Sequence, residues 1–455
     1  MRPSIRIGNG CGFWGDNQDA PVHLAAHGGL DYLTLEYLAE LTMSILAQQK
    51  QRDANAGYAS DFIGVLERLT PHLHQQPRLR VVTNAGGMNP HACARAARAV
   101  LDQAGLHART VAVVSGDDLL PRLDELLAAG HPLAHQDTGQ PLAEVRSRVV
   151  SANAYLGAEP IARALAAGAD VVITGRVADA ALTLGPAVHE LGWPWTDPQR
   201  LGMGLVAGHL IECGAQATGG LWCNWQRCDL AEVGYPIVTI YADGTLELSK
   251  PAGSGGAVNL ETVREQLLYE VGDPARYLTP DGVVDFTKLH LDQVGSDCVR
   301  LTADAGVGLP PPDSYKVSIA YRDGYTAAGT LVIAGPGAVA KARACGEIIR
   351  RRLQQAGLTL ARYHVETLGA GATVPDAVPT DYDPTEVVLR VAVHDPRREA
   401  VERFSRELAP LVTSGPPGVT GYTTGRPPVR EVFAYWPALI ARAAVTPTVE
   451  IMPSR

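Results

Sequence analysis

One short helical stretch of the sequence carries three side chains that can do chemistry together. Within Gly208–Gly214, His209, Glu212 and Cys213 stand at positions i, i+3 and i+4. Residues at this spacing share one face of a helix. A histidine beside a carboxylate and a thiol can supply a base and a nucleophile, or metal ligands, whereas the structural alternative is a packed helix with a buried thiol. We predict a catalytic role for all three residues.

A second set of polar residues follows the predicted β-strands, where the chain turns into loops. The set consists of Asp16, Asn84, Asn153, Arg176 and Asp179. An arginine after a buried strand can hold a carboxylate or phosphate as a bidentate donor, and the alternative is a local ion pair with Asp179. The amides of Asn84 and Asn153 can orient a carbonyl or a developing oxyanion. We predict substrate-binding roles for these five residues.

A glycine loop, Gly253–Gly256, precedes a predicted helix and can cradle an anionic group with its backbone N–H groups. No P-loop ending follows this loop, and a plain turn is an equal alternative. We assign substrate binding to Lys250, Gly255 and Gly256 on this pattern.

The sequence does not identify a cofactor. The loop Gly8–Gly15 does not complete a dinucleotide fingerprint, and the second predicted strand ends without a convincing acidic residue for a ribose. The spacing of Cys213, Cys223 and Cys228 does not match a structural zinc site. The pair Asp117–Asp118 can bind a divalent cation, but capping of the next helix is the better interpretation. The metal requirement therefore stays open.

The elements that must position these residues alternate between strand and helix. Predicted strands cover Ser4–Ile7, Asp31–Tyr37, Leu79–Thr83, Thr110–Val114 and Asp170–Thr174. A repeated strand–loop–helix pattern is typical of an α/β fold, here a mostly parallel sheet with flanking helices. We expect the strands that end at Thr83, Val114 and Thr174 to be parallel neighbours or near-neighbours in one sheet, so that their loops share one crevice.

A proline-rich break at Pro310–Pro312 predicts a domain boundary, which gives an α/β domain over 1–312 and a second domain over 313–455. The second domain is predicted as an α+β sandwich. It begins with a hairpin of Tyr315–Tyr321 and Thr326–Ala334, and a helix over Gly337–Gln355 follows. We expect this domain to cover the site or to form an oligomer interface.

The composition of the chain argues against several classes of function. The chain has 455 residues, a net charge of −9 and no basic block, which argues against nucleic-acid binding. No apolar run has membrane-spanning length, and the N-terminus lacks a signal-peptide core. The seven cysteines are scattered through a long chain, as expected for free thiols in a reducing compartment. We predict a cytoplasmic protein.

Several segments together resemble the acyclic terpene utilisation (AtuA-like) family. They are Gly12–Asp16, Tyr37–Thr42, Thr83–Gly87, Ala152–Gly157, Thr174–Asp179, Gly208–Gly220, Gln266–Glu270, Tyr277–Asp281 and Ser414–Gly418. They span nearly the whole chain and are specific in combination. The resemblance implies a part in the breakdown of branched terpenoid acids through acyl-CoA thioesters, without a defined reaction. Many longer members carry a further ferredoxin-like domain, whose role we expect to be absent here or supplied by another polypeptide.

The hypothesis that joins these observations is a lyase or hydratase that works by acid–base catalysis on a small carboxylate or a coenzyme A thioester. His209 and Glu212 would transfer protons, and Arg176 would hold an anionic group. Two alternatives stay open: a hydrolase that uses Cys213 or an activated water, and a non-catalytic subunit of an acyl-CoA-processing complex. We expect a homo-oligomer with no nucleic-acid or membrane partner.

Overall fold

The structure is a computed structural model that describes residues 2–379, 382–421 and 425–453. The chain forms two compact units, and each is described here by itself. Unit 1 comprises Met1–Ala320 and Tyr435–Arg455, and unit 2 comprises Tyr321–Ala434. The last segment of the chain therefore belongs with the first unit.

Unit 1 is built on a ten-stranded sheet. In spatial order its strands are β11 (Leu289–Gly295), β12 (Cys298–Ala303), β8 (Leu246–Ser249), β7 (Ile237–Tyr241), β1 (Ser4–Asn9), β2 (Tyr32–Leu35), β3 (Arg80–Thr83), β6 (Val171–Thr174), β4 (Val111–Ser115) and β18 (Thr448–Ile451). The five strands from β1 to β4 in this order are parallel. The other five are antiparallel to their neighbours. The sheet is therefore mixed, where the sequence predicted a mostly parallel one, because later hairpin strands extend the parallel centre.

The neighbours predicted for three strands are confirmed. β3 pairs with β6 and β6 pairs with β4, both in parallel, with Thr83 opposite Ile173 and Val114 opposite Thr174. Parallel neighbours end at one edge of a sheet, so the loops after these strands lie together. This edge carries the residues of the candidate site.

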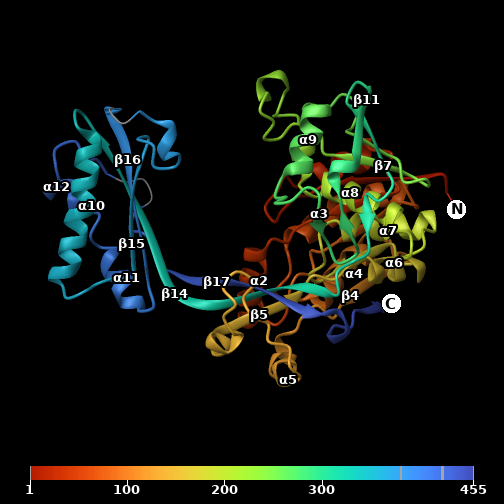
Figure 1. Cartoon of the computed structure of the whole chain (residues 1–455), viewed down its shortest axis with the longest axis horizontal. Coiled ribbons are helices and arrows are strands. Elements are labelled where there is room, and N and C mark those ends of the chain that lie inside the picture. The colour runs from red at the N-terminus through yellow and green to blue at the C-terminus, as the bar shows by residue number, and fades with distance from the viewer. Residues whose placement is uncertain (1, 380–381, 422–424, 454–455) are drawn as a thin grey trace. The chain divides into compact units, whose positions relative to one another are not determined.

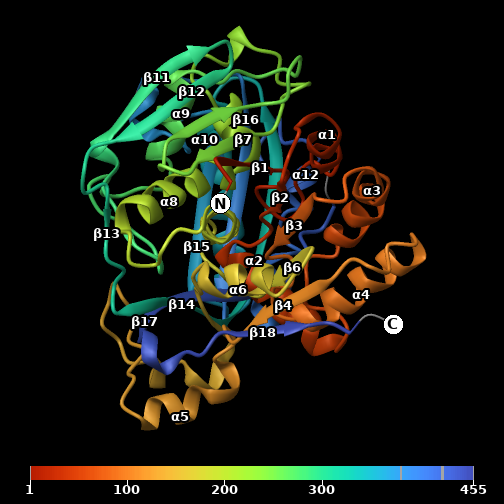
Figure 2. The ribbon, with the colours of Figure 1, turned by 90° about the vertical axis from the view of Figure 1, so that its right-hand side faces the viewer.

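Helices cover both faces of the parallel centre. Their bounds are α1 (Ala20–His27), α3 (Asp61–Gln75), α4 (Pro90–Gln103), α6 (Glu159–Ala166), α7 (Ala181–Leu191) and α8 (Pro198–Glu212). Figure 2 shows α1, α3 and α4 on one side of β1, β2 and β3, and α8 on the other. On that other side α7 packs against α6 and α8 (Figure 1).

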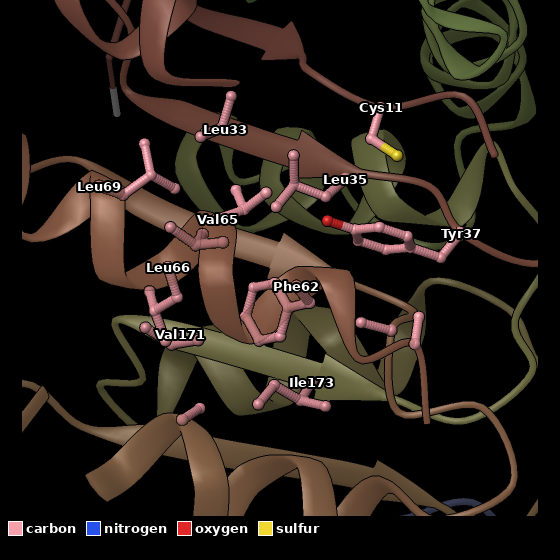
Figure 3. Packing of buried hydrophobic residues seen from close by; sticks show 14 of the residues in the cluster. Cys11, Leu33, Leu35, Tyr37, Phe62, Val65, Leu66, Leu69, Val171 and Ile173 are labelled. Carbon is pink, nitrogen blue, oxygen red and sulfur yellow. The ribbon is translucent and has the colours of Figure 1, made fainter. Parts of the chain in front are cut away.

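The apolar core beneath α3 follows directly from sequence spacing. Phe62, Val65, Leu66 and Leu69 recur at helical spacing and are buried. Alternate residues of β2 and β6 point toward them, because successive side chains of a strand face opposite sides of a sheet (Figure 3). The facing residues are Leu33, Leu35, Val171 and Ile173. This packing fixes the strands whose ends carry the site.

Two further segments complete the wall of unit 1 near the site. α2 (Glu40–Arg52) follows β2, and β5 (Val149–Ala154) pairs with β14 (Ser314–Ala334). The Tyr155 amide donates to the Lys316 carbonyl at 2.9 Å, which ties the end of β5 to the first part of β14. α9 (Leu260–Leu268) packs against α8.

Unit 2 contains a sheet with helices packed against it. Its strands are β15 (Arg362–Leu368), β16 (Glu386–Asp395), the later part of β14 and the start of β17 (Arg430–Ala441), and its helices are α10 (Ala338–Gln355), α11 (Arg398–Phe404) and α12 (Leu411–Ser414). The predicted hairpin over Tyr315–Ala334 is wrong, because β14 is one strand of 21 residues. Gly324 has a φ of +85° and an Asp395 carbonyl close by, so it serves a local irregularity of the strand and not a turn. The predicted sandwich over 313–455 is not confirmed.

Candidate active site

A cavity of about 740 Å³ opens at the carboxyl edge of the parallel strands, and all of its lining residues belong to unit 1. This volume suits a small organic ligand. Its ionisable lining residues are Glu36, Glu40, Asp179, Glu212, Glu270, Arg176, Lys316, His209, Cys213, Tyr155, Tyr269 and Tyr277. The predicted catalytic residues His209, Glu212 and Cys213 and the predicted binding residues Arg176 and Asp179 therefore share one cavity.

His209 and Glu212 form a hydrogen-bonded pair in the last turn of α8. His209 Nδ1 lies 2.9 Å from Glu212 Oε1, and both side chains are buried. His209 Nε2 and Glu212 Oε2 make no hydrogen bond in the described structure. Burial alone would lower the pKa of His209, but the charge and hydrogen bond of Glu212, with nearby α9 carbonyls, outweigh it and raise that pKa. The pair therefore favours an imidazolium whose Nδ1 proton is held by Glu212.

The ring of His209 is held from several sides. Tyr277 and Phe286 pack at centroid distances of 5.0 Å and 5.4 Å. The Gln266 amide, on α9, donates to the His209 carbonyl at 2.9 Å. These contacts position the imidazole without using its ring nitrogens.

Arg176 lies at the centre of a buried charge cluster. Its Nη1 donates to the Leu38 carbonyl at 2.8 Å and lies 3.1 Å from Asp179 Oδ1 and 3.8 Å from Glu36 Oε1. The guanidinium also lies over the Tyr155 ring, 4.1 Å from its centroid. Burial would lower the pKa of Arg176, but the charges of Asp179, Tyr155 and Glu36 raise it, so the group stays cationic.

The two carboxyls beside Arg176 carry raised pKa values. Burial and the charge of Asp179 raise the pKa of Glu36, against the lowering effect of Arg176. Burial raises the pKa of Asp179 to about 7, helped by the charges of Glu212 and Glu40 and opposed by Arg176. A carboxyl such as Asp179, whose pKa lies near neutral pH, is suited to proton transfer.

A second ion pair closes the cavity wall at α2 and β14. Glu40 Oε1 accepts hydrogen bonds from the Tyr155 hydroxyl at 2.7 Å and from Lys316 Nζ at 3.0 Å. Burial would raise the pKa of Glu40, but Lys316 and Tyr155 lower it to about 2. Glu40 is therefore a fixed anion that cannot carry a proton at neutral pH.

Cys213 caps the carboxyl end of α8 and lines the cavity. Burial and the negative charge of Glu212 raise the pKa of its thiol. The thiol is the poorly nucleophilic form of cysteine, so this environment does not activate Cys213.

The two predicted asparagines lie behind the cavity wall and not in its lining. Asn84 is fully buried, donates to Glu36 Oε1, and accepts from the Tyr37 amide at 2.8 Å. Asn153 Nδ2 donates to Asp117 Oδ2 at 2.8 Å, and that oxygen also accepts the Arg176 amide at 2.9 Å. These contacts hold the site's own loops, and a role of the two amides toward a substrate stays a prediction.

Asp16 also acts on the protein itself. Its Oδ2 accepts the Gly12 amide at 2.8 Å and its Oδ1 accepts the Tyr235 hydroxyl at 2.5 Å. A side chain at Gly12 would meet the Cys213 backbone at 2.7 Å, so the loop packs closely on the end of α8. Asp16 therefore positions Gly12 and Phe13, which line the cavity.

The glycine loop Gly253–Gly256 lies outside the lining of this cavity, and its predicted role in substrate binding stays a prediction. Lys250 Nζ donates to the Ser254 carbonyl at 2.7 Å and lies 3.2 Å from Asp297. A Cβ at Gly256 would meet the Thr218 carbonyl at 2.2 Å, and one at Gly255 the Asp229 carbonyl at 2.3 Å. These glycines permit close backbone packing.

Four site residues escaped the sequence analysis: Glu36, Glu40, Tyr155 and Lys316. Glu36 was read as part of a strand, whereas β2 ends at Leu35 and Glu36 follows it directly. An acidic residue at a strand end was a usable signal. Lys316 comes from a segment assigned to the other domain, so no local pattern could join it to Glu40.

No group of three or more histidine, cysteine, aspartate or glutamate side chains in the described part of the chain could hold a metal ion. Within the same residues, no helix is long and apolar enough to cross a membrane.

Comparisons with curated proteins and with solved structures return no match. The model of the family described as "Acyclic terpene utilisation family protein AtuA" matches residues 5–451. The match covers nearly the whole chain, and so this protein belongs to the acyclic terpene utilisation family AtuA.

Proposed function

We propose that this protein is an acid–base lyase of the hydratase or C–C lyase type that acts on a branched acyl substrate. The single observation that carries the proposal is the His209–Glu212 pair, with a 2.9 Å hydrogen bond at Nδ1 and no partner at Nε2, in a cavity that also contains Arg176. A carboxylate on one imidazole nitrogen orients the ring and leaves the other for proton transfer. Family membership supports a role in the use of acyclic terpenes.

In this proposal Arg176 binds the acyl carbonyl or carboxylate. Its charge is permanent, and the raised pKa values of Glu36 and Asp179 mean that those carboxyls neutralise it only in part. A neighbouring guanidinium stabilises the negative charge that develops on an acyl oxygen when an adjacent C–H bond breaks. His209 then delivers a proton to the leaving oxygen or recovers it in the reverse direction.

The charge of the cavity limits what enters it. The lining carboxylates are Glu36, Glu40, Asp179, Glu212 and Glu270, against the cations Arg176 and Lys316. Such a lining disfavours the phosphates of coenzyme A. It favours either a free branched acid or the acyl part of a thioester whose nucleotide remains outside the cavity.

The alternative of a covalent hydrolase is weaker because of the environment of Cys213. A nucleophilic cysteine needs a lowered pKa, usually from a nearby cation or base. Cys213 instead has burial and Glu212 acting in the opposite direction. The proposal therefore assigns no nucleophile to the chain.

The test uses 3-hydroxy-3-methylbutanoyl-CoA and the corresponding free acid as probes, with loss of water followed by mass spectrometry. The wild-type protein should eliminate water from at least one probe. His209→Gln should remain folded and lose the activity by a factor of about 10² to 10⁴. Asp304→Asn, a change on the exposed surface, is the control and should behave as wild type. An unaffected His209→Gln variant would overturn the proposal.

A further inference from the structure

Elimination next to an acyl group needs two proton transfers, and the proposed function uses His209 for only one of them. A second group must remove the proton from the carbon beside the carbonyl. The following inference rests on the proposed function and identifies that group among the residues that line the cavity.

Three of the other lining carboxyls are held by the protein itself or are of low basicity. Glu40 accepts from both Tyr155 and Lys316 and is a fixed anion of low basicity. One oxygen of Glu36 accepts the Leu38 amide at 2.8 Å and the Asn84 amide, and the residue is only 3% exposed. Glu212 holds His209.

Asp179 differs from Glu36 and Glu212 in the exposure of its side chain. Its side chain is 35% exposed, against 5% for Glu36, although both line the cavity. Its Oδ1 lies 3.1 Å from Arg176 Nη1 and has no hydrogen-bond partner in the described structure. A substrate oxygen bound by Arg176 would therefore bring its neighbouring carbon close to this carboxyl.

The packing of α8 brings His209 beside the same loop. Gly208 precedes His209, and a Cβ at Gly208 would lie 2.5 Å from the Cα of Ala180, the residue after Asp179. Only a glycine allows this approach. This close approach places the loop that carries Asp179 against the turn that carries His209. The two side chains can therefore act on adjacent atoms of one substrate.

We propose that Asp179 is the base that removes the proton from the carbon beside the acyl group, while His209 protonates the leaving oxygen. The C–H bond breaks toward Asp179, and its electron pair moves onto the acyl group, whose oxygen carries the negative charge as an enolate beside Arg176. The electron pair then returns to form the C=C bond as the C–O bond breaks, and the hydroxyl leaves as water with the proton of His209. Solvent afterwards takes the proton from Asp179 and restores the imidazolium, so no oxidant or reductant is needed.

The local charges fit this role. Arg176 on the same loop and Lys316 on β14 are cations and favour the carboxylate form of Asp179. Burial favours the carboxylic acid form, and so do the acidic groups of the surrounding elements, Glu36, Glu40 and Glu212. The balance leaves the pKa of Asp179 at about 7. A base is most effective when its pKa lies near the working pH.

The experiment separates the two proton transfers on 3-hydroxy-3-methylbutanoyl-CoA in D₂O. Exchange of the proton beside the carbonyl needs only the base, whereas loss of water needs both groups. Asp179→Asn should lose both exchange and elimination by about 10² or more. His209→Gln should lose elimination but retain exchange, and Asp304→Asn should retain both.

The possible failures are distinguishable. If Asp179→Asn still exchanges at the wild-type rate while wild type eliminates water through His209, the role of Asp179 is overturned and the proposed function stands. If His209→Gln loses exchange while Asp179→Asn keeps it, the roles of the two residues are reversed and the inference fails. If wild type neither exchanges nor eliminates with the thioester or the free acid, the proposed function itself fails.

Discussion

Two sets of buried polar residues meet at one edge of the sheet in unit 1, and they differ in how fully they are paired. Behind the cavity wall, Asp117 accepts hydrogen bonds from Asn153 and from the Arg176 amide. On the wall, His209 Nε2, Glu36 Oε2 and Asp179 Oδ1 are buried without hydrogen bonds, although Asp179 Oδ1 lies 3.1 Å from Arg176 Nη1. Behind the wall, Asn153 Oδ1 is the exception among these residues and also lacks a partner within the described part of the chain. Natural proteins seldom leave buried polar atoms unpaired, and such atoms call for an explanation.

This difference separates residues that hold the loops of the site in place from residues whose polar atoms are available to a substrate. Paired groups repay the cost of their burial and fix the loops, so removing them should lower stability. Unpaired groups cost stability in the free protein and become useful only when a substrate supplies the missing partner. The first set should therefore respond to mutation in folding, and the second in activity.

The largest effect on stability is expected for Asp117→Ala. This change leaves the Arg176 amide and Asn153 Nδ2 buried without an acceptor, at about 1–3 kcal/mol for each group. Urea unfolding measures the loss. The neighbouring Asp118→Ala removes one partly buried bond to the Leu120 amide and should cost clearly less. Equal losses in the two variants would remove the distinction made for Asp117.

A smaller loss of stability is expected for Gly175→Ala. A Cβ at this position would lie 2.3 Å from Asp117 Oδ1, so the loop after β6 must shift, at about 1–3 kcal/mol. Gly64→Ala is the matched control, because Gly64 lies in α3 with open space around it. That change should stabilise the protein by up to about 1 kcal/mol. Destabilisation by both variants would argue against a specific clash at Gly175.

Asp179→Asn, a change on the cavity wall, should alter stability in the opposite direction from the two preceding variants. The pKa of Asp179 is raised to about 7 in the folded state, so the folded protein binds more protons than the unfolded chain between about pH 4 and 7. Its contribution to stability is present below pH 4 and is lost as the pH rises through 7. Asp179→Asn should therefore flatten the pH dependence and be more stable than wild type at pH 8. Lower stability of the variant at pH 8 would show that the ion pair with Arg176 dominates instead.

The smallest effect is expected for Cys213→Ser. The thiol is protonated and has no part in the proposed proton transfers. Elimination of water by the variant should stay close to the wild-type rate in the mass-spectrometric assay. A folded but inactive Cys213→Ser variant would return the preference to the covalent hydrolase.

Local sequence patterns predicted the parts of this site that depend on one element. The spacing of His209 and Glu212 predicts their shared helix face, and the strand–loop–helix repeat predicts the neighbours of β6. The same patterns could not show that Asn84 and Asn153 lie outside the cavity lining, because nothing local to an asparagine shows which groups its amide contacts. Lys316 and Glu40 are 276 residues apart in the sequence, so their contact is long-range and no local pattern contains it.

The C-terminal part of the chain shows a second limit of prediction from local sequence patterns. Arg322–Tyr325 contains an Asp-Gly pair between two apolar stretches, which is a strong local signal for a hairpin. β14 nevertheless continues through it, because β16 pairs with the strand from Tyr325 onward and supplies the hydrogen bonds that a turn would have ended. Tertiary pairing here outweighs the local preference of the turn residues.

The most direct test of the central claim is the protonation state of His209, because it needs no substrate. Nitrogen NMR of protein labelled with ¹⁵N-histidine can follow this ring, with His209→Gln assigning its signals. The account predicts a pKa above the usual value for histidine, a neutral form protonated at Nδ1 and free at Nε2, and a lower pKa in Glu212→Gln. A neutral ring protonated at Nε2, or a pKa unchanged by Glu212→Gln, would contradict it.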